Sequence, residues 1–185
     1  MSDIRIIKTK QNIEYAFLNL LNEKEFKSIT INNICQYALT SRSTFYLHYL
    51  DKYDLLDQLI KAQLSFFQEI VEQRFTELIS EKFEETIVEF YHELIKRRAI
   101  IQALFKVEES EYNLKQQFED ILYEHWLAYL NQRLNVGFKE LVARIGASIV
   151  FDTLTWTFEY GLDEEALVFV EEIRTKIFEI PKSNE

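Results

Sequence analysis

The near absence of glycine and proline constrains this chain most. The chain has 185 residues but only three glycines and one proline, and none of these four residues falls within residues 1–136. A β-sheet protein of this length needs many turn glycines, whereas helices exclude both residue types from their interiors. The sequence therefore predicts an all-α protein, and its 48% of hydrophobic residues is enough for a substantial core.

Charge divides the chain into two unlike parts. Residues 1–60 hold seven basic and seven acidic residues, whereas residues 61–185 hold 14 basic and 24 acidic residues and carry the whole net charge of −10. The acidic part is expected to be repelled by nucleic acid, and the neutral part is not. We expect two domains, a small one over residues 1–50 and a larger one over residues 51–185.

Cysteine content and apolar runs bear on the cellular compartment. Cys35 is the single cysteine, so no internal disulfide can form, which fits a reducing cytosol. No apolar run approaches the ~18 residues of a membrane span, and the first ten residues lack the apolar stretch of a secretory signal. The expectation is a soluble, cytoplasmic protein without a membrane partner.

Apolar spacing and capping residues outline the expected helices. Apolar residues at helical spacing predict a first helix over residues 3–22. Thr30 is expected to cap a short second helix, Ser41 a short third helix, and Asp51 a long fourth helix that ends near residue 79. Further helices are expected at residues 81–98, 99–106, 109–135, 138–160 and 164–180.

Two short helices separated by a break at Leu39 have the layout of a helix-turn-helix motif. The second of them would lie in a DNA major groove, with Phe45 and Tyr49 facing inward. Arginine bonds guanine through two hydrogen bonds, and hydroxyl groups bond bases or phosphates. We therefore expect double-stranded DNA as a partner. The candidate contacts are Thr30, Thr40, Ser41, Arg42, Ser43, Thr44, Tyr46, Leu47, His48 and Lys52.

The run TINNICQYALTSRSTFYLHYLDKYDLL, residues 30–56, resembles the DNA-binding domain of the TetR-family transcriptional regulators. The resemblance covers roughly residues 5–60 and departs from the family at Leu39, which replaces a turn glycine, and at Leu50, which replaces a proline. It implies a homodimer that binds a palindromic operator, most often as a repressor. It also implies a larger helical domain with an inducer pocket and a four-helix dimer interface.

The larger part holds candidate pocket and interface residues. The segment 138–160 is apolar on both sides, so we expect both sides to be buried. The pocket candidates are Tyr91, Tyr123, His125, Trp126, Tyr129, Asp152 and Trp156. The interface candidates are Ala147, Phe151, Leu154, Phe158, Phe169, Val170, Ile173 and Ile177. A hydrogen-bonded core histidine is the alternative for His125, and an ion pair or a helix cap is the alternative for Asp152, which we expect to be buried.

The sequence offers little support for catalysis. The three histidines are scattered and have no metal-ligand spacing with Cys35, and no glycine loop precedes residue 137. We therefore expect no enzyme, no metal and no cofactor. Three functions stay open: a regulator released from DNA by a small-molecule inducer, an activator controlled by a protein partner, and a helical interaction module with a vestigial DNA-binding domain.

Overall fold

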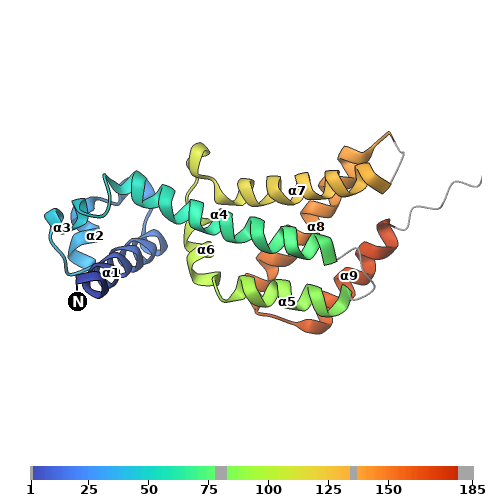
Figure 1. Ribbon diagram of the computed structural model, residues 1–185, viewed down its shortest axis with the longest axis horizontal. Coiled ribbons are helices and arrows are strands. Elements are labelled where there is room, and N and C mark those ends of the chain that lie inside the picture. Colours follow the sequence, from blue (N-terminus) through green and yellow to red (C-terminus); the bar gives the residue numbers. More distant parts are fainter. Residues whose placement is uncertain (1, 78–82, 134–136, 179–185) are drawn as a thin grey trace, which may run out of the picture. The chain divides into compact units, whose positions relative to one another are not determined.

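The computed structural model describes residues 2–77, 83–133 and 137–178 (Figure 1). All regular structure within these ranges is helical, which confirms the predicted all-α fold. The chain forms two compact units: a head unit, residues 1–65 with 99–115, and a larger unit, residues 66–98 with 116–185. Because compact packing does not show where an independently folding domain ends, the predicted boundary at residue 50 stays a prediction.

The head unit begins with a long helix whose apolar stripe forms the centre of the core. All five predicted stripe residues are buried, namely Ile13, Ala16, Phe17, Leu20 and Leu21. The helix that carries them packs against the second helix, which in turn packs against the third. The elements of this unit are α1 (Ser2–Glu23), the 3-10 turn η1 (Phe26–Ser28), α2 (Ile31–Tyr37), α3 (Arg42–Tyr46), the first part of α4 (Lys52–Glu77), most of α6 (Arg98–Leu104) and the 3-10 turn η2 (Ser110–Tyr112).

The larger unit is a helical bundle with an aromatic core. Phe67 and Phe118 stack face to face, with ring centres 3.8 Å apart, and join the second part of α4 to α7. Helix α5 packs against α8 and α9, and α8 packs against α9. The elements of this unit are the rest of α4, α5 (Phe83–Ile95), α7 (Leu114–Arg133), α8 (Lys139–Tyr160) and α9 (Glu164–Phe178).

One predicted helix start is wrong. The seventh helix starts at Leu114 instead of residue 109, because η2 and an extended Asn113 (φ −77°, ψ 90°) precede it. Asparagine side chains compete for backbone hydrogen bonds and therefore favour helix boundaries over helix interiors. The predicted boundaries at residues 79, 81, 135 and 180 fall outside the described residues.

The junction between α8 and α9 is formed by a glycine and an aspartate. Gly161 has φ 98° and ψ 173°. This combination of a positive φ with an extended ψ is open essentially to glycine alone. The amide of Ala166 donates to Asp163 Oδ1 over 3.1 Å. This contact makes Asp163 the N-cap of α9.

Candidate nucleic-acid interface

The turn between α2 and α3 is closed by two backbone hydrogen bonds. The amide of Thr40 donates to the carbonyl of Cys35 (2.9 Å), and the amide of Leu39 donates to the carbonyl of Gln36 (3.3 Å). This pair of bonds requires a left-handed residue directly after the helix. Leu39 fills that position with φ 51°, at a cost on the order of 1 kcal/mol for a residue other than glycine. The departure from glycine therefore leaves the turn intact.

A hydroxyl cluster starts the third helix. Ser41 Oγ accepts the amide hydrogen of Thr44 over 3.0 Å, so Ser41 is the N-cap that the sequence predicted. The same oxygen lies 2.7 Å from Ser43 Oγ and 2.8 Å from Thr44 Oγ1. Hydroxyl hydrogens rotate freely between partners. The three groups can therefore turn from one another to a phosphate or base without moving the backbone.

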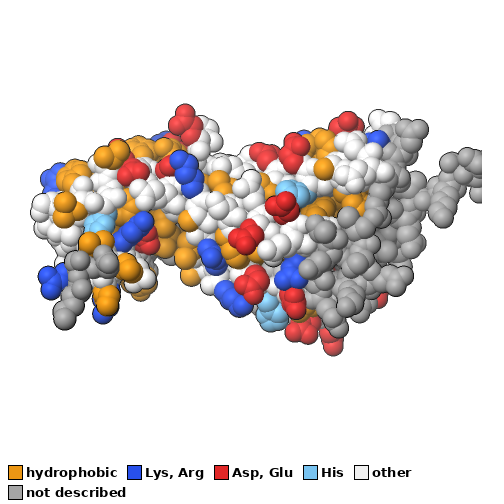
Figure 2. All heavy atoms as spheres, viewed as in Figure 1, with side chains coloured by type: hydrophobic (Ala, Val, Ile, Leu, Met, Phe, Trp, Pro, Cys, Tyr) orange, Lys and Arg blue, Asp and Glu red, His pale blue; other side chains and the backbone are white. Residues whose placement is uncertain are grey.

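Helix α3 has distinct inward and outward faces. Phe45 (0% exposed) and Tyr49 (2% exposed) face the core, as predicted. Successive residues of a helix are about 100° apart, so Ser43 and Leu47, each two positions from Phe45, lie almost opposite it. Both are exposed, and so are Tyr46, on the flank of that face, and Arg42, in the first turn of the helix. On the molecular face drawn in Figure 2, hydrophobic and basic side chains reach the surface of the head unit.

The second short helix is held by a reciprocal cap. The amide of Asn33 donates to Thr30 Oγ1 and the amide of Thr30 donates to Asn33 Oδ1, each over 3.1 Å. This arrangement is a capping box with asparagine in the role usually taken by glutamate. Thr30 is nevertheless exposed, and Thr40 and His48 are partly exposed, so all three remain within reach of a ligand.

The charged group of the DNA-contact candidate Lys52 is bound inside the head unit. Its ammonium donates to the carbonyl oxygens of Phe26, Lys27 and Ile29, over 2.9, 3.1 and 2.9 Å. Burial lowers the pKa of this ammonium. Because a lysine has three N–H donors, none remains for a phosphate in this arrangement. We call this internal arrangement the Lys52 clamp, and the DNA contact expected of Lys52 stays a prediction.

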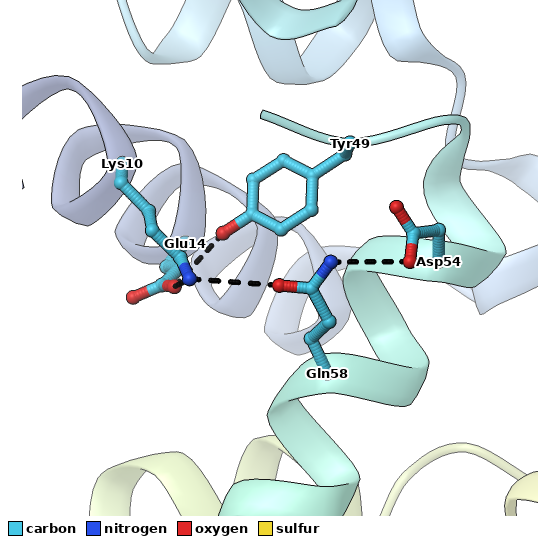
Figure 3. A network of polar contacts seen from close by, with 5 residues as sticks. All are labelled: Lys10, Glu14, Tyr49, Asp54 and Gln58. Carbon is cyan, nitrogen blue, oxygen red and sulfur yellow. Dashed lines mark hydrogen bonds and ion pairs between the residues drawn. The ribbon is translucent and has the colours of Figure 1, made fainter. Parts of the chain in front are cut away.

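A polar network that the sequence did not predict joins α1 to α4 (Figure 3). Tyr49 donates its phenol hydrogen to Glu14 over 2.8 Å, and Lys10 lies 3.9 Å from the same carboxylate. Lys10 also reaches Gln58 (3.5 Å), whose amide donates to Asp54 over 3.1 Å. Glu14 and Tyr49 are 35 positions apart, so no local sequence pattern could signal their contact.

Two groups of this network have shifted pKa values. Burial, followed by the hydrogen bond to Glu14, raises the pKa of Tyr49 well above its ordinary value. The amide hydrogen of Leu50, 2.8 Å from Asp54 Oδ2, lowers the pKa of Asp54, and Gln58 adds to this effect. Both Tyr49 and Asp54 therefore keep fixed protonation states near neutral pH, which makes the network a permanent support for α3.

The predicted pocket residues of α5 and α7 lie in different surroundings. Tyr91 is buried and donates to the carbonyl of Val150 over 3.2 Å. His125 is partly buried, and its Nδ1 lies 2.8 Å from the carbonyl oxygen of Ile121. Trp126 is buried with its ring edge-on to Phe75. Tyr123 faces the guanidinium of Arg144, 5.1 Å from its ring centre, and Tyr129 is partly buried.

A small cavity in the larger unit is lined by a different set of residues from the predicted pocket residues. Its volume is ≈ 20 Å³, close to that of one water molecule. Its lining residues are Val71, Arg74, Phe75, Ile87, Phe90, Leu122 and Val150. None of the predicted pocket residues belongs to this lining.

The two faces of α8 were assigned the wrong way round. Asp152, which was expected to be buried, is exposed, and Trp156 is 39% exposed. The predicted interface residues of α8, namely Ala147, Phe151, Leu154 and Phe158, are instead buried inside the same chain, with at most 7% exposure. They are unavailable to a partner. Periodicity shows that α8 has two apolar faces but not which of them meets the protein's own core.

Two of the predicted interface residues of α9 are exposed. Phe169 and Ile173 are 61% and 40% exposed, and Val170 is partly exposed. The side chain of Ile177 lies outside those that the structure describes. On α8, Leu141 (60%) and Ile145 (41%) are exposed together with Trp156. Both helices thus present unpartnered apolar side chains.

Metal binding and membrane spanning are two further properties to consider for residues 2–77, 83–133 and 137–178. No group of three or more histidine, cysteine or acidic side chains in these ranges could hold a metal ion. Helix α8 is long and apolar enough to cross a membrane by length and composition, with a mean hydropathy of 1.2 in its most apolar window. Because 44% of that window is buried inside the protein, core packing already accounts for this composition.

Comparison with solved structures identifies the fold. A TetR transcriptional regulator from Streptococcus agalactiae 2603V is 24% identical to the chain, with a TM-score of 0.61 over 94% of this chain and 97% of the other. NalD, the secondary repressor of the MexAB-OprM multidrug efflux pump in Pseudomonas aeruginosa, is 15% identical, with a TM-score of 0.63 over 91% and 96%. The dihydroxyacetone kinase operon activator DhaS is 19% identical, with a TM-score of 0.52 over 93% and 98%.

Sequence comparison gives a shorter match. No family model matches the chain. YxbF of Bacillus subtilis (strain 168), an uncharacterized HTH-type transcriptional regulator, is 36% identical over 64 residues, which is 34% of this chain and 17% of that protein. The match therefore spans about a sixth of the relative's length. Over almost its whole length the chain has the fold of the TetR-family transcriptional regulators, and the resemblance stated for residues 30–56 is confirmed.

Proposed function

We propose that the protein is a cytoplasmic, dimeric transcriptional regulator that binds a palindromic DNA operator through α3. The observation that carries the proposal is the outward face of α3, which presents Arg42, Ser43, Tyr46 and Leu47 to solvent on a helix anchored by a fully buried Phe45. A short, rigidly anchored helix with an exposed polar face fits the major groove. The TetR-like fold supports this reading.

Each exposed group has a task in the proposed complex. Arg42 forms no ion pair with a described residue, so its guanidinium is available for two hydrogen bonds to a guanine. Tyr46 and His48 would donate to phosphate oxygens, and the Ser41 hydroxyl cluster would turn toward the backbone or a base. The Lys52 clamp and the Tyr49 network would act indirectly, by fixing the orientation of α3.

We propose that the partner subunit is a second copy of this chain, docked on the exposed faces of α8 and α9. Leu141, Ile145 and Trp156 of α8 and Phe169 and Ile173 of α9 form the corrected candidate interface. A face of this kind, at the end of a chain whose own core is already filled, favours a self-complementary contact. The dimer would place two α3 helices on successive major grooves about 34 Å apart, or on a multiple of that spacing.

Control of the DNA-bound state has two candidate mechanisms. In the first, a small-molecule inducer binds the larger unit and stabilises a state that releases DNA. The cavity of ≈ 20 Å³ described above is far smaller than the ~300 Å³ of a typical ligand site, so this cavity would have to widen. In the second, a protein partner contacts the acidic larger unit, as the notably negative charge of residues 61–185 allows. Repression is the proposed outcome in the first case and activation in the second.

Selection of duplexes from a random pool, followed by titration at several salt concentrations, tests the proposal. A palindromic site should emerge, and its affinity should fall as salt rises, because phosphate contacts release counterions. Arg42→Ala should weaken binding roughly 5- to 150-fold, the range for one guanine contact. Lys61→Ala is the charge-matched control, since its ammonium already lies 2.6 Å from Asp57.

Three results would count against the proposal. Recovery of no preferred duplex from a stable dimer would favour a helical interaction module with a vestigial head. Equal losses for Arg42→Ala and Lys61→Ala would show that only net charge matters. A monomer at micromolar concentration would exclude the palindromic arrangement.

A further inference from the structure

The most exposed large hydrophobic side chains among the described residues are three leucines of the head unit. Leu39, Leu47 and Leu50 are 94%, 83% and 82% exposed, whereas Tyr160, the next in order, is 68% exposed. A single exposed leucine is ordinary on a protein surface. Three of them within residues 39–50 contribute almost nothing to the core of the free protein, so their effect must be sought at the surface.

Leu47 differs from the other two leucines because it belongs to the end of α3. Its backbone angles, φ −75° and ψ −19°, are helical, so the periodicity of α3 extends to it. Leu47 therefore lies about 200° around the helix axis from Phe45, one turn after Ser43 and at the centre of the outward face. Leu39 lies in the turn before α3, and Leu50 lies in the link after it.

An aliphatic side chain at this place suits one base only. In the major groove each base edge carries hydrogen-bond donors or acceptors, and thymine alone adds a methyl group. A leucine set against the other edges would remove water from their polar atoms without replacing the lost hydrogen bonds, which is unfavourable. The outward face of α3 therefore combines one guanidinium with one group that favours a thymine.

We propose that Leu47 is a specificity-determining residue that contacts the 5-methyl group of one thymine in each half-site of the operator. The inference rests on the proposed function, because it requires α3 to lie in the major groove. It assigns base preference to a side chain that can make no hydrogen bond. The preferred operator thus contains an invariant thymine near the position read by Arg42.

Deoxyuridine substitution tests this contact directly, because it removes the methyl group and leaves base pairing unchanged. In the selected duplex each thymine is replaced in turn, and binding of the full-length dimer is titrated. One position per half-site should lose roughly fourfold in affinity, the value for one buried methyl-sized group. Leu47→Ala should bind the thymine and deoxyuridine duplexes equally, and Leu50→Ala, the matched control, should retain the difference. Thermal unfolding of both variants should match that of the unmodified protein, since both side chains are exposed.

The possible failures are distinguishable. Selective binding that is insensitive to every deoxyuridine substitution would overturn the role of Leu47 and leave the proposed function intact. A methyl effect that persists in Leu47→Ala would also overturn it, by assigning the contact to another side chain. Absence of any selected duplex would overturn the proposed function itself, and this inference with it.

Discussion

The head unit and the larger unit are specified by contacts of different range. In the head unit, Thr30 with Asn33, Ser41 with Thr44, and Asp51 with Asp54 each join residues three positions apart. In the larger unit, the stacked pair Phe67 and Phe118 joins helices that are far apart in the sequence. Local capping signals can be recognised in a sequence, whereas the pairing of distant apolar faces depends on the assembled fold. Substitutions in the two units should therefore differ in their effects on stability and self-association.

Removal of the α3 anchor should have the largest effect. Phe45 is fully buried, so Phe45→Ala should lower the free energy of unfolding by about 3–5 kcal/mol. Phe138→Ala, the same substitution at a side chain that is 54% exposed in the larger unit, is the control and should change it by less than about 0.5 kcal/mol. Denaturant unfolding followed by circular dichroism measures both. Similar losses would contradict the assignment of Phe45 to the core.

The corrected faces of α8 can be separated by two leucines. Leu154 is 1% exposed and Leu141 is 60% exposed. Leu154→Ala should lower the free energy of unfolding by about 2–5 kcal/mol, whereas Leu141→Ala should mainly weaken self-association. Chemical unfolding and sedimentation equilibrium distinguish the two effects. The assignment fails if Leu141→Ala is the more destabilising of the two at low protein concentration.

The Lys52 clamp should matter more for stability than an exposed ion pair does. Lys52→Ala removes a charged donor from three carbonyl oxygens, and we expect a loss of about 2 kcal/mol. Lys61→Ala removes an ammonium that pairs with Asp57 on the surface, and it should cost much less stability because solvent screens this pair. Thermal unfolding of the two variants provides the comparison. If Lys52→Ala left thermal unfolding unchanged but reduced DNA affinity, Lys52 would be a phosphate contact and not an internal support.

Asp54 should make the stability of the head unit depend on acid. Its pKa is lowered from an ordinary value of 3.8, mainly by the amide hydrogen of Leu50. A lowered pKa means that the folded state favours the charged carboxylate. The stabilisation is therefore present above pH 3.8 and disappears as the pH falls through the lower folded-state pKa.

Asp54→Asn should accordingly lower the free energy of unfolding by about 1 kcal/mol at pH 7 and reduce its fall between pH 5 and pH 2, the window set by the ordinary value of 3.8. Unfolding curves at several pH values measure this difference. Asp152→Asn is a control, because this carboxylate is exposed on the larger unit. Parallel pH profiles for unmodified and Asp54→Asn proteins would rule out the proposed linkage.

The smallest expected effect concerns the backbone of the turn. Leu39 has a positive φ and is 94% exposed, so Leu39→Gly should relieve the strain while losing no packing. After the greater flexibility of an unfolded glycine is subtracted, a gain of about 0.5 kcal/mol remains. Thermal unfolding at high precision detects such a gain. A clear loss of stability would mean that the leucine side chain packs on the head after all.

The predictable part of the candidate site lies within one short segment. The caps Thr30, Ser41 and Asp51 and the inward Phe45 and Tyr49 all follow from patterns within a few residues of each other. The Lys52 clamp was not predictable, because its acceptors are backbone carbonyls about 25 positions away. A lysine at a helix start looks the same in sequence whether it meets a phosphate or a carbonyl.

The amino-acid sequence alone was enough to predict that this chain is helical, where most of its helices lie, and which face of α3 is turned outward. These properties depend on turn residues, caps and periodicity, which act over one or two helical turns. The assembled fold was needed to show which apolar face of α8 is buried, that Asp152 is exposed, and how Glu14 meets Tyr49. A helix with two apolar faces gains similar free energy from burying either one, so the choice is made by the neighbouring helices that the complete fold brings against it.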